Sequence, residues 1–191
     1  MKAHVKDRNE VIKKLNSFAV FLGRVVRDDT YWFNEKTKVR IRREKEITSE
    51  NKIGKEIILL TYKKKENRVS AEGNAMEVNE EHECELSSAE PVETFLSDAG
   101  FFVDLKKHKD VLDWKYNFTL PQSGQTIQVT LELCTVPPLG DFLEVEVLSQ
   151  KDDRDFTESV RKELEKLIVL SGIDKSQIEN RYYSEMLKDS H

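Results

Sequence analysis

Apolar residues recur along the chain at two spacings, which separate predicted helices from predicted strands. A helical spacing places apolar side chains on one face of residues 10–22, 91–99 and 155–170, with a glycine close behind each segment. Glycine favours the end of a helix because it readily adopts the left-handed backbone conformation found there. A short final helix is predicted around residues 176–187.

Alternation of apolar and polar side chains predicts strands in most of the remaining chain. We expect these strands at residues 25–33, 37–45, 55–63, 80–86, 101–109, 111–119, 126–133 and 142–148. The polar segments 48–54 and 65–79 contain few apolar residues and are predicted to be loops. This pattern predicts an α+β protein, in which an antiparallel meander closes into an eight-stranded barrel with helices packed outside it.

Composition narrows the class of protein. With 191 residues, of which 38% are hydrophobic, the chain is long enough for one well-cored domain and short for two, so a single domain over residues 1–191 is predicted. Charged residues make up 35% of the chain, but apolar clusters recur throughout, which is not typical of disorder. The net charge of -5 argues against nucleic acid as the main partner.

Targeting signals and zinc motifs are absent from the sequence. The first residues contain no apolar signal-peptide core, and no apolar run is long enough to cross a bilayer, so we expect a cytoplasmic protein without a membrane partner. Cys84 and Cys134 have no metal-ligand spacing, and the four histidines form no zinc motif. Any bound metal is therefore expected to have oxygen ligands.

Charged side chains on the predicted strands are sorted by sign. One strand face is basic and contains Lys38, Arg40 and Arg42. Two faces are acidic, one with Glu81, Glu83 and Glu85 and the other with Glu144 and Glu146. A fourth face is polar and contains Gln128, Thr130 and Glu132. A solvated face on a half-buried strand gives the same alternation. If the faces instead line a barrel, the cations could hold a polyanion while the carboxylates hold metal ions. The apolar faces would then lie outside, under the helices.

Glu144 and Glu146 are the most informative pair. They point to one side of their strand, whereas Leu143 and Val145 point to the other. Two carboxylates this close repel each other unless positive charge lies between them. A hard divalent cation such as Mg²⁺, bound by carboxylates and by substrate phosphates, would supply that charge.

Six short segments carry a family resemblance. DTYW at residues 29–32, VRIR at 39–42, TYK at 61–63, ECE at 83–85, KHK at 107–109 and LGDFLEVE at 139–146 occur in the order seen in the CYTH family. The chain resembles these triphosphate tunnel metalloenzymes over nearly its whole length. LGDFLEVE and the later RYYSEML at 181–187 are most similar to the class IV adenylate cyclase branch.

The resemblance implies a tunnel-shaped barrel that binds a nucleotide or another triphosphate with Mg²⁺ or Mn²⁺. It implies that Lys63 and Glu144 are catalytic, that Lys2, Arg40, Arg42, Lys63, Lys107 and Lys109 bind substrate, and that Glu85, Glu132, Glu144 and Glu146 bind metal. The expected reaction converts ATP to cyclic AMP and pyrophosphate. Hydrolysis of inorganic or thiamine triphosphate and non-catalytic triphosphate binding are the alternatives, and a homodimer stays open.

The sequence departs from the family pattern at two places. The family begins with an ExExK strand, and here Lys2 matches the lysine while Met1 leaves no room for the glutamates. We therefore expect either a truncated start or impaired metal binding. The family aspartate before the LG turn aligns with Glu132 if residues 135–138 form a longer loop, and with Cys134 without a gap. Both side chains fall on the same strand face, and the carboxylate is preferred.

Overall fold

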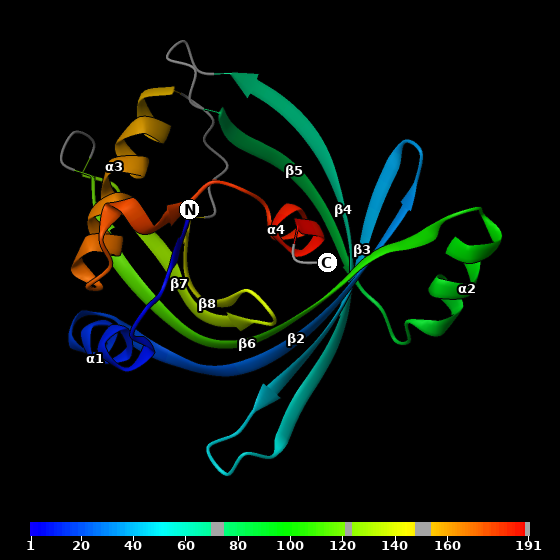
Figure 1. The fold of residues 1–191 in the computed structure, drawn as a ribbon, viewed down its shortest axis with the longest axis horizontal. Coiled ribbons are helices and arrows are strands. Elements are labelled where there is room, and N and C mark those ends of the chain that lie inside the picture. Colours follow the sequence, from blue (N-terminus) through cyan, green and yellow to red (C-terminus); the bar gives the residue numbers. More distant parts are fainter. Residues whose placement is uncertain (70–74, 121–123, 148–153, 190–191) are drawn as a thin grey trace. The chain divides into compact units, whose positions relative to one another are not determined.

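The computed structural model describes residues 1–69, 75–120, 124–147 and 154–189 (Figure 1). The helices in these residues are α1 (Arg8–Phe18), α2 (Glu90–Asp98), α3 (Arg154–Leu170) and α4 (Tyr183–Asp189), with a 3₁₀ turn at Lys175–Gln177. The strands are β1 (Lys2–His4), β2 (Val20–Asn34), β3 (Thr37–Ile47), β4 (Ile53–Val69), β5 (Ala75–Glu85), β6 (Phe102–Thr119), β7 (Thr126–Val136), β8 (Gly140–Glu146) and β9 (Ile178–Glu179).

All the strands of the described residues join one sheet, in the order β5-β4-β3-β2-β6-β7-β8-β1-β9. The pairings of β4 with β5, of β6 with β7, of β7 with β8, and of β1 with β8 and β9 are antiparallel. The predicted α+β class is confirmed. The described sheet has nine strands rather than eight, because residues 101–119 form essentially one strand and the short β1 and β9 add two. Closure into a barrel stays a prediction.

The first helix is shorter than predicted. It ends at Phe18, and Ala19 already has an extended backbone, so Val20, Phe21 and Leu22 begin β2 as exposed residues. Three consecutive apolar residues satisfy a helical and a strand pattern equally well, which is why the boundary was misplaced. At the other end of α1, the side chain of Asp7 accepts a hydrogen bond from the backbone nitrogen of Glu10 at 3.0 Å.

The predicted loop at residues 65–79 is wrong in its described parts. Lys65 pairs with Asn79 and Val69 with Ala75 in the β4–β5 ladder, while residues 70–74 lie outside the described chain. A hairpin held by backbone hydrogen bonds needs no apolar face, so its sequence resembles that of a loop. The final predicted helix is divided into the 3₁₀ turn, β9 and α4. No helix in the described ranges has the length and apolar character needed to span a membrane.

The chain divides into two compact units. Unit 1 comprises Met1–Val26, Ile47–Asn51 and Lys109–His191, and unit 2 comprises Arg27–Glu46 and Lys52–His108. The single domain predicted from chain length stays a prediction.

The core of unit 1 lies between two helices and one face of the sheet (Figure 1). Val11 and Leu15 of α1, together with Leu164 and Ile168 of α3, pack with a group of β6, β7 and β8 residues that includes Trp114, Leu131, Leu133, Leu143 and Val145. The indole nitrogen of Trp114 donates to Asn16 Oδ1 of α1 at 2.8 Å. Each fully buried leucine stabilises the fold by about 1.5–3 kcal/mol. Helices therefore cover the apolar face here, as predicted.

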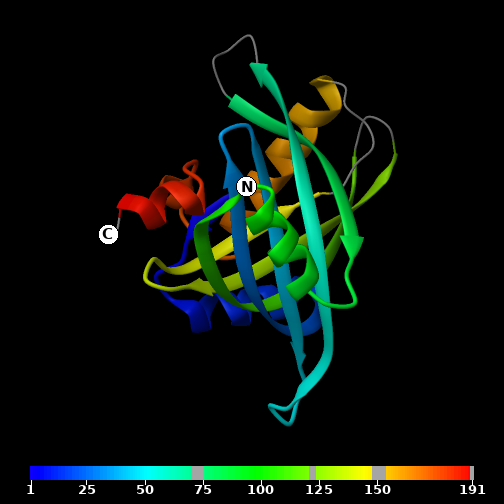
Figure 2. The ribbon, with the colours of Figure 1, turned by 90° about the vertical axis from the view of Figure 1, so that its right-hand side faces the viewer.

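The core of unit 2 lies under α2. Figure 2 shows α2 in front of the strands, where Leu96 and Ala89 pack with Ile41 of β3 and with the partly buried Trp32 of β2. Pro91 lies in the first turn of α2, where its missing N–H costs no helical hydrogen bond, and Gly100 adopts a φ of 82° just after the helix. Since Val39 and Ile41 are buried on one face of β3, Arg40 and Arg42 are directed to the opposite face.

Candidate functional site

A buried carboxylate organises the basic face of unit 2. The side chain of Asp29, on β2, is 0% exposed. Arg42 donates to it through one edge of its guanidinium, with Nε 2.7 Å from Oδ1 and Nη2 3.0 Å from Oδ2. Lys107 Nζ lies 3.1 Å from Oδ2. Burial by itself would raise the pKa of Asp29, but the hydrogen bonds from Arg42 and the charge of Lys107 outweigh it and hold that pKa well below its usual range.

Tyr31 completes this arrangement from the same face of β2. Its ring lies under two ammonium groups, with Lys38 Nζ 5.2 Å and Lys107 Nζ 5.4 Å from the ring centroid. Lys107 Nζ also donates to the Tyr31 hydroxyl at 3.0 Å, and that hydroxyl donates to Asp29 Oδ2 at 3.4 Å. Lys107 is thus held by a carboxylate, a hydroxyl and an aromatic face.

Arg40 has a different environment from Arg42. Its Nη2 donates to Thr61 Oγ1 at 3.0 Å, and Thr61 donates in turn to Glu83 Oε2 at 2.9 Å. The side chain is only 13% exposed, and Nε is buried without a hydrogen-bond partner in the described part of the chain. An unsatisfied buried donor is costly, so a buried guanidinium N–H of this kind suits a bound anion.

Two further predicted residues lie on the β4–β5 hairpin of unit 2. Glu85 is exposed at the end of β5, opposite Leu59. Lys63 pairs with Glu81 in the same ladder, and the side chains of both lie outside the described part of the structure. The predicted roles of Lys63 and Glu85 stay predictions.

In unit 1, an acidic pair surrounds a buried lysine. Glu132 of β7 lies directly opposite Glu144 of β8. Lys109 Nζ is 2.6 Å from Glu144 Oε1 and 4.0 Å from Glu132 Oε2, and the lysine side chain is 4% exposed. Burial alone would lower the pKa of Lys109, but the nearby carboxylates outweigh it and raise the pKa above its usual value. The ammonium therefore supplies the positive charge that the carboxylates require.

Tyr183 of α4 covers the same cluster. Lys109 Nζ lies 4.8 Å and Lys2 Nζ 5.3 Å from its ring centroid, while its hydroxyl is 3.5 Å from Cys134 Sγ. The ring packs edge-on against Phe142 at 5.1 Å. Burial, with the nearby Glu144, raises the pKa of the tyrosine, and burial raises the pKa of the Cys134 thiol to about 11.

Lys2 and Glu146 lie at the border of this cluster. Lys2 pairs with Glu144 in the β1–β8 ladder, and burial lowers the pKa of its ammonium although Glu144 and Glu179 oppose that change. Glu146 is exposed at the end of β8, opposite Thr130. Glu132 and Cys134, the two residues that could align with the family aspartate, both lie beside Glu144. Glu132 is directly opposite it in the ladder, and Cys134 Sγ lies 3.8 Å from Glu144 Oε1.

The carboxylates of unit 1 have the right chemistry for a hard cation. In residues 1–69, 75–120, 124–147 and 154–189, no group of three or more histidine, cysteine, aspartate and glutamate side chains gathers to hold a metal. Glu132 and Glu144 supply two oxygen-donor groups, and Mg²⁺ is commonly bound through one or two carboxylates with water and substrate phosphates as its other ligands. The donor set therefore fits Mg²⁺ or Mn²⁺, with Lys109 competing for the same oxygens.

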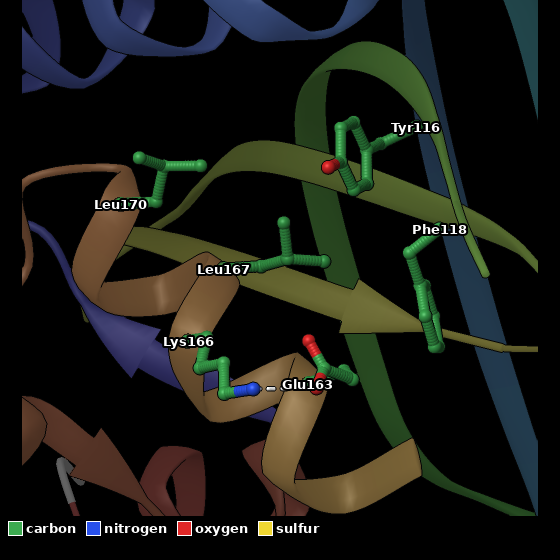
Figure 3. Close-up of a pocket in the computed structure, with 6 residues that line it drawn as sticks. All are labelled: Tyr116, Phe118, Glu163, Lys166, Leu167 and Leu170. Atoms are coloured by element: carbon green, nitrogen blue, oxygen red, sulfur yellow. Dashed lines mark hydrogen bonds and ion pairs between the residues drawn. The ribbon is translucent and has the colours of Figure 1, made fainter. Parts of the chain in front are cut away.

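A separate hollow in unit 1 contains none of the predicted site residues (Figure 3). It has a volume of about 270 Å³ and lies between α3 and β6, lined by Tyr116, Phe118, Glu163, Lys166, Leu167 and Leu170. Lys166 and Glu163 form an ion pair at 2.6 Å. The lining is otherwise apolar and aromatic, which is not suited to a triphosphate.

The structure also identifies contacts that the sequence did not predict. Asp29 and Tyr31 belong to a segment quoted for the family resemblance, but neither was assigned a role. Tyr183 belongs to the RYYSEML segment quoted for the same resemblance and was assigned no role, although its ring contacts Lys2 and Lys109. The available signal for Asp29 was its position on the same strand face as Tyr31, next to the strand that carries Arg40 and Arg42.

Comparisons with known proteins show the fold. No protein-family model and no curated protein matches the chain. Among solved structures, the PH1819 protein of Pyrococcus horikoshii is similar with a TM-score of 0.73 and 21% identity, over 100% of this chain and 97% of that one. The PH1012 protein of the same organism has a TM-score of 0.68 and 22% identity, over 96% and 95% of the two chains.

A third solved structure belongs to a protein with a proposed activity. It is a Vibrio parahaemolyticus protein described as a proposed adenylate cyclase, similar with a TM-score of 0.61 and 15% identity over 98% of this chain and 95% of that one. The three structures share the fold of this chain over nearly its whole length.

Proposed function

We propose that the chain is a CYTH-type enzyme that binds a triphosphate with Mg²⁺ or Mn²⁺. The observation that carries the proposal is the environment of Arg40, whose buried Nε has no hydrogen-bond partner in the described chain. Arg40, Arg42 and Lys107 all lie close enough to the Asp29 carboxylate to lower its pKa by their charge. A face with three cations and one unsatisfied buried donor suits a polyanion. Arg40, Arg42 and Lys107 of unit 2 bind phosphate oxygens in this proposal.

The acidic cluster of unit 1 has its own role. Glu132, Glu144 and Glu146 would hold the metal, which when bound neutralises charge on phosphate oxygens. Lys109 balances Glu132 and Glu144 when no metal is bound, because its ammonium lies within 4.0 Å of both carboxylates. Tyr183 keeps Lys2 and Lys109 in place by presenting its ring to both ammonium groups.

The reaction we propose is that of an adenylate cyclase. The 3′-oxygen of ATP attacks the α-phosphorus, the bond from that phosphorus to the bridging oxygen of the β-phosphate breaks, and pyrophosphate leaves. The 3′-hydroxyl proton passes to solvent or to a basic side chain. Fixed cations stabilise the charge that develops on the transferring phosphoryl group, which is the main requirement of this chemistry. The fold shared with a proposed adenylate cyclase supports this choice.

The test is an assay of the purified full chain with ATP, inorganic triphosphate or thiamine triphosphate, each with Mg²⁺ or Mn²⁺. Cyclic AMP formed from ATP is the expected product. Release of orthophosphate would indicate a triphosphatase rather than a cyclase. Binding without turnover would indicate a non-catalytic triphosphate-binding module. No binding of any of the three compounds in titration calorimetry would overturn the proposal. Arg43→Ala is the matched control, because Arg43 lies on the same strand as Arg40 but pairs with Glu93 of α2.

A further inference from the structure

We infer that Asp29 is a positioning residue, which fixes the guanidinium of Arg42 in the orientation that receives a phosphate group. This inference rests on the proposed function and extends it to a residue with no assigned role. Asp29 is acidic, and it lies on a face that is otherwise expected to attract an anion. Its function must therefore act through its neighbours rather than through direct contact with phosphate.

The hydrogen bonds of Arg42 define how it is held. Asp29 accepts from Nε at 2.7 Å and from Nη2 at 3.0 Å, so one edge of the planar guanidinium is committed to the carboxylate. Because the group is planar, fixing Nε and Nη2 also fixes the direction of Nη1. An arginine without this carboxylate would lose its side-chain freedom only on binding the ligand, and that loss would weaken binding.

The same carboxylate reduces repulsion within the basic cluster. Arg40, Arg42 and Lys107 carry three positive charges near one point, and each lowers the pKa of Asp29 by its charge, although burial opposes them. The carboxylate cancels one of the three charges and keeps Arg42 and Lys107 at hydrogen-bond distance. The cluster is thus assembled before any ligand arrives.

Burial separates this arrangement from an ordinary ion pair at the surface. Asp29 is 0% exposed, and the Arg42 side chain is 15% exposed. Apolar side chains of similar volume often stabilise a fold as well as a buried ion pair does, so stability alone is a weak reason for the pair. Pre-orientation of Arg42 gives the buried Asp29–Arg42 ion pair a functional role.

The decisive experiment compares the affinity of inorganic triphosphate for the wild type and for Asp29→Asn, measured by titration calorimetry on the full chain. If Asp29 acted only as a negative charge, its removal would tighten binding of an anion. Positioning predicts the opposite result, a loss of roughly 10-fold in affinity, because Arg42 must then be ordered on binding. Glu93→Gln is the control, since it makes the same chemical change in the Arg43–Glu93 pair of unit 2.

A second variant tests whether the effect passes through Arg42. Arg42→Lys keeps the charge but cannot donate the paired Nε and Nη2 hydrogen bonds to Asp29, so it should lose a similar amount of affinity. The double variant should lose little more than either single variant, because both changes remove the same arrangement. The Nε–H resonance of Arg42 in the wild type, assigned by its absence from Arg42→Lys, should move in Asp29→Asn and stay in place in Glu93→Gln.

The outcomes distinguish the inference from the proposed function. If the wild type binds triphosphate and Asp29→Asn binds it equally or more tightly, the inference is wrong and the proposed function stands. If the wild type binds no triphosphate, the proposed function fails. Should Asp29→Asn not fold, Asp29→Glu takes its place, because it keeps the charge but shifts the carboxylate by one methylene. Wild-type affinity in a folded Asp29→Glu whose Arg42 Nε–H resonance has moved would overturn the inference equally.

Discussion

Glu132 and Glu144 lie directly opposite each other across the β7–β8 ladder, with the ammonium of Lys109 close to both. Like charges at directly opposed positions destabilise a sheet, so this pair depends on the lysine. A cation of the chain therefore stands where the sequence predicted a metal ion. In the proposed function, a metal ion would either replace this ammonium or bind beside it.

The substitution Lys109→Met tests this dependence. It removes the buried ammonium that lies within 4.0 Å of both carboxylates and should lower the free energy of unfolding by about 3–5 kcal/mol. Mg²⁺ should then raise the thermal midpoint of Lys109→Met more than that of the wild type, because the metal no longer competes with the ammonium. Thermal unfolding with and without Mg²⁺ measures both effects. Lys106→Met, at an exposed position on the same strand, serves as control, and equal metal responses would contradict the competition.

The substitution Glu144→Gln separates metal binding from folding. The amide oxygen can still accept a hydrogen bond from Lys109, so the fold should be kept, while the loss of a charged ligand should reduce metal-dependent turnover by at least about 100-fold. Steady-state kinetics across a range of Mg²⁺ concentrations is the measurement. Glu163→Gln removes a carboxylate from an exposed pair on α3 and should leave turnover unchanged. Unchanged turnover in Glu144→Gln would remove this residue from the catalytic centre.

The substitution Arg40→Ala addresses the unsatisfied donor. Charged hydrogen bonds contribute about 1.5–3 kcal/mol, so the affinity for inorganic triphosphate should fall by roughly 10- to 100-fold. The fold should survive, because Thr61 can keep its hydrogen bond to Glu83 without the arginine. Calorimetric titration beside circular dichroism checks both points. Arg43→Ala should bind like the wild type, and an unfolded Arg40→Ala would show that this arginine is structural.

The two cysteines should differ sharply in reactivity. Cys84 is exposed on β5, whereas Cys134 is buried and burial raises its pKa to about 11. Because the thiolate is the reactive form, Cys134 should stay unmodified near pH 8 in the folded protein. Ellman's reagent should therefore titrate one thiol per folded chain and two in denaturant. A second fast-reacting thiol in the folded protein would show that α4 opens over Cys134.

Acid should weaken the contribution of Asp29. Its folded pKa lies below the ordinary value of about 3.9, because Arg42 and Lys107 outweigh the effect of burial. The stability it adds is therefore fully present above pH ~4 and is lost as the pH falls below that value. Urea midpoints of the wild type and Asp29→Asn should converge between pH ~4 and pH ~2.5. A constant difference over that range would contradict a depressed pKa.

The strand pattern could be predicted because alternation is a local property. Leu143 and Val145 are buried under the helices while Glu144 lies on the other face, because successive side chains of a strand point to opposite sides. The boundary at Phe18 and the hairpin arms near Lys65 could not be predicted in this way. In both places the local pattern is ambiguous, and pairing with a distant strand decides the conformation.

The candidate site was predictable as sets of side chains but not as contacts. Sequence parity placed Arg40 and Arg42 together on one face, yet their environments differ because Asp29 reaches only one of the two with both oxygens. Likewise, nothing in the sequence placed Tyr183, forty-nine residues along the chain, against Cys134. Such contacts depend on strand order and helix docking, which a single sequence does not specify.

Each compact unit contains one tryptophan, and this gives the protein an internal reporter of cooperativity. Trp114 lies in the core of unit 1 and Trp32 packs against the core of unit 2. In variants that keep only one of the two tryptophans, the fluorescence of that tryptophan would therefore report the thermal unfolding of its own unit. Coincident transitions would mean that the two halves of the chain unfold as one thermodynamic body, whereas separated transitions would give each half its own stability.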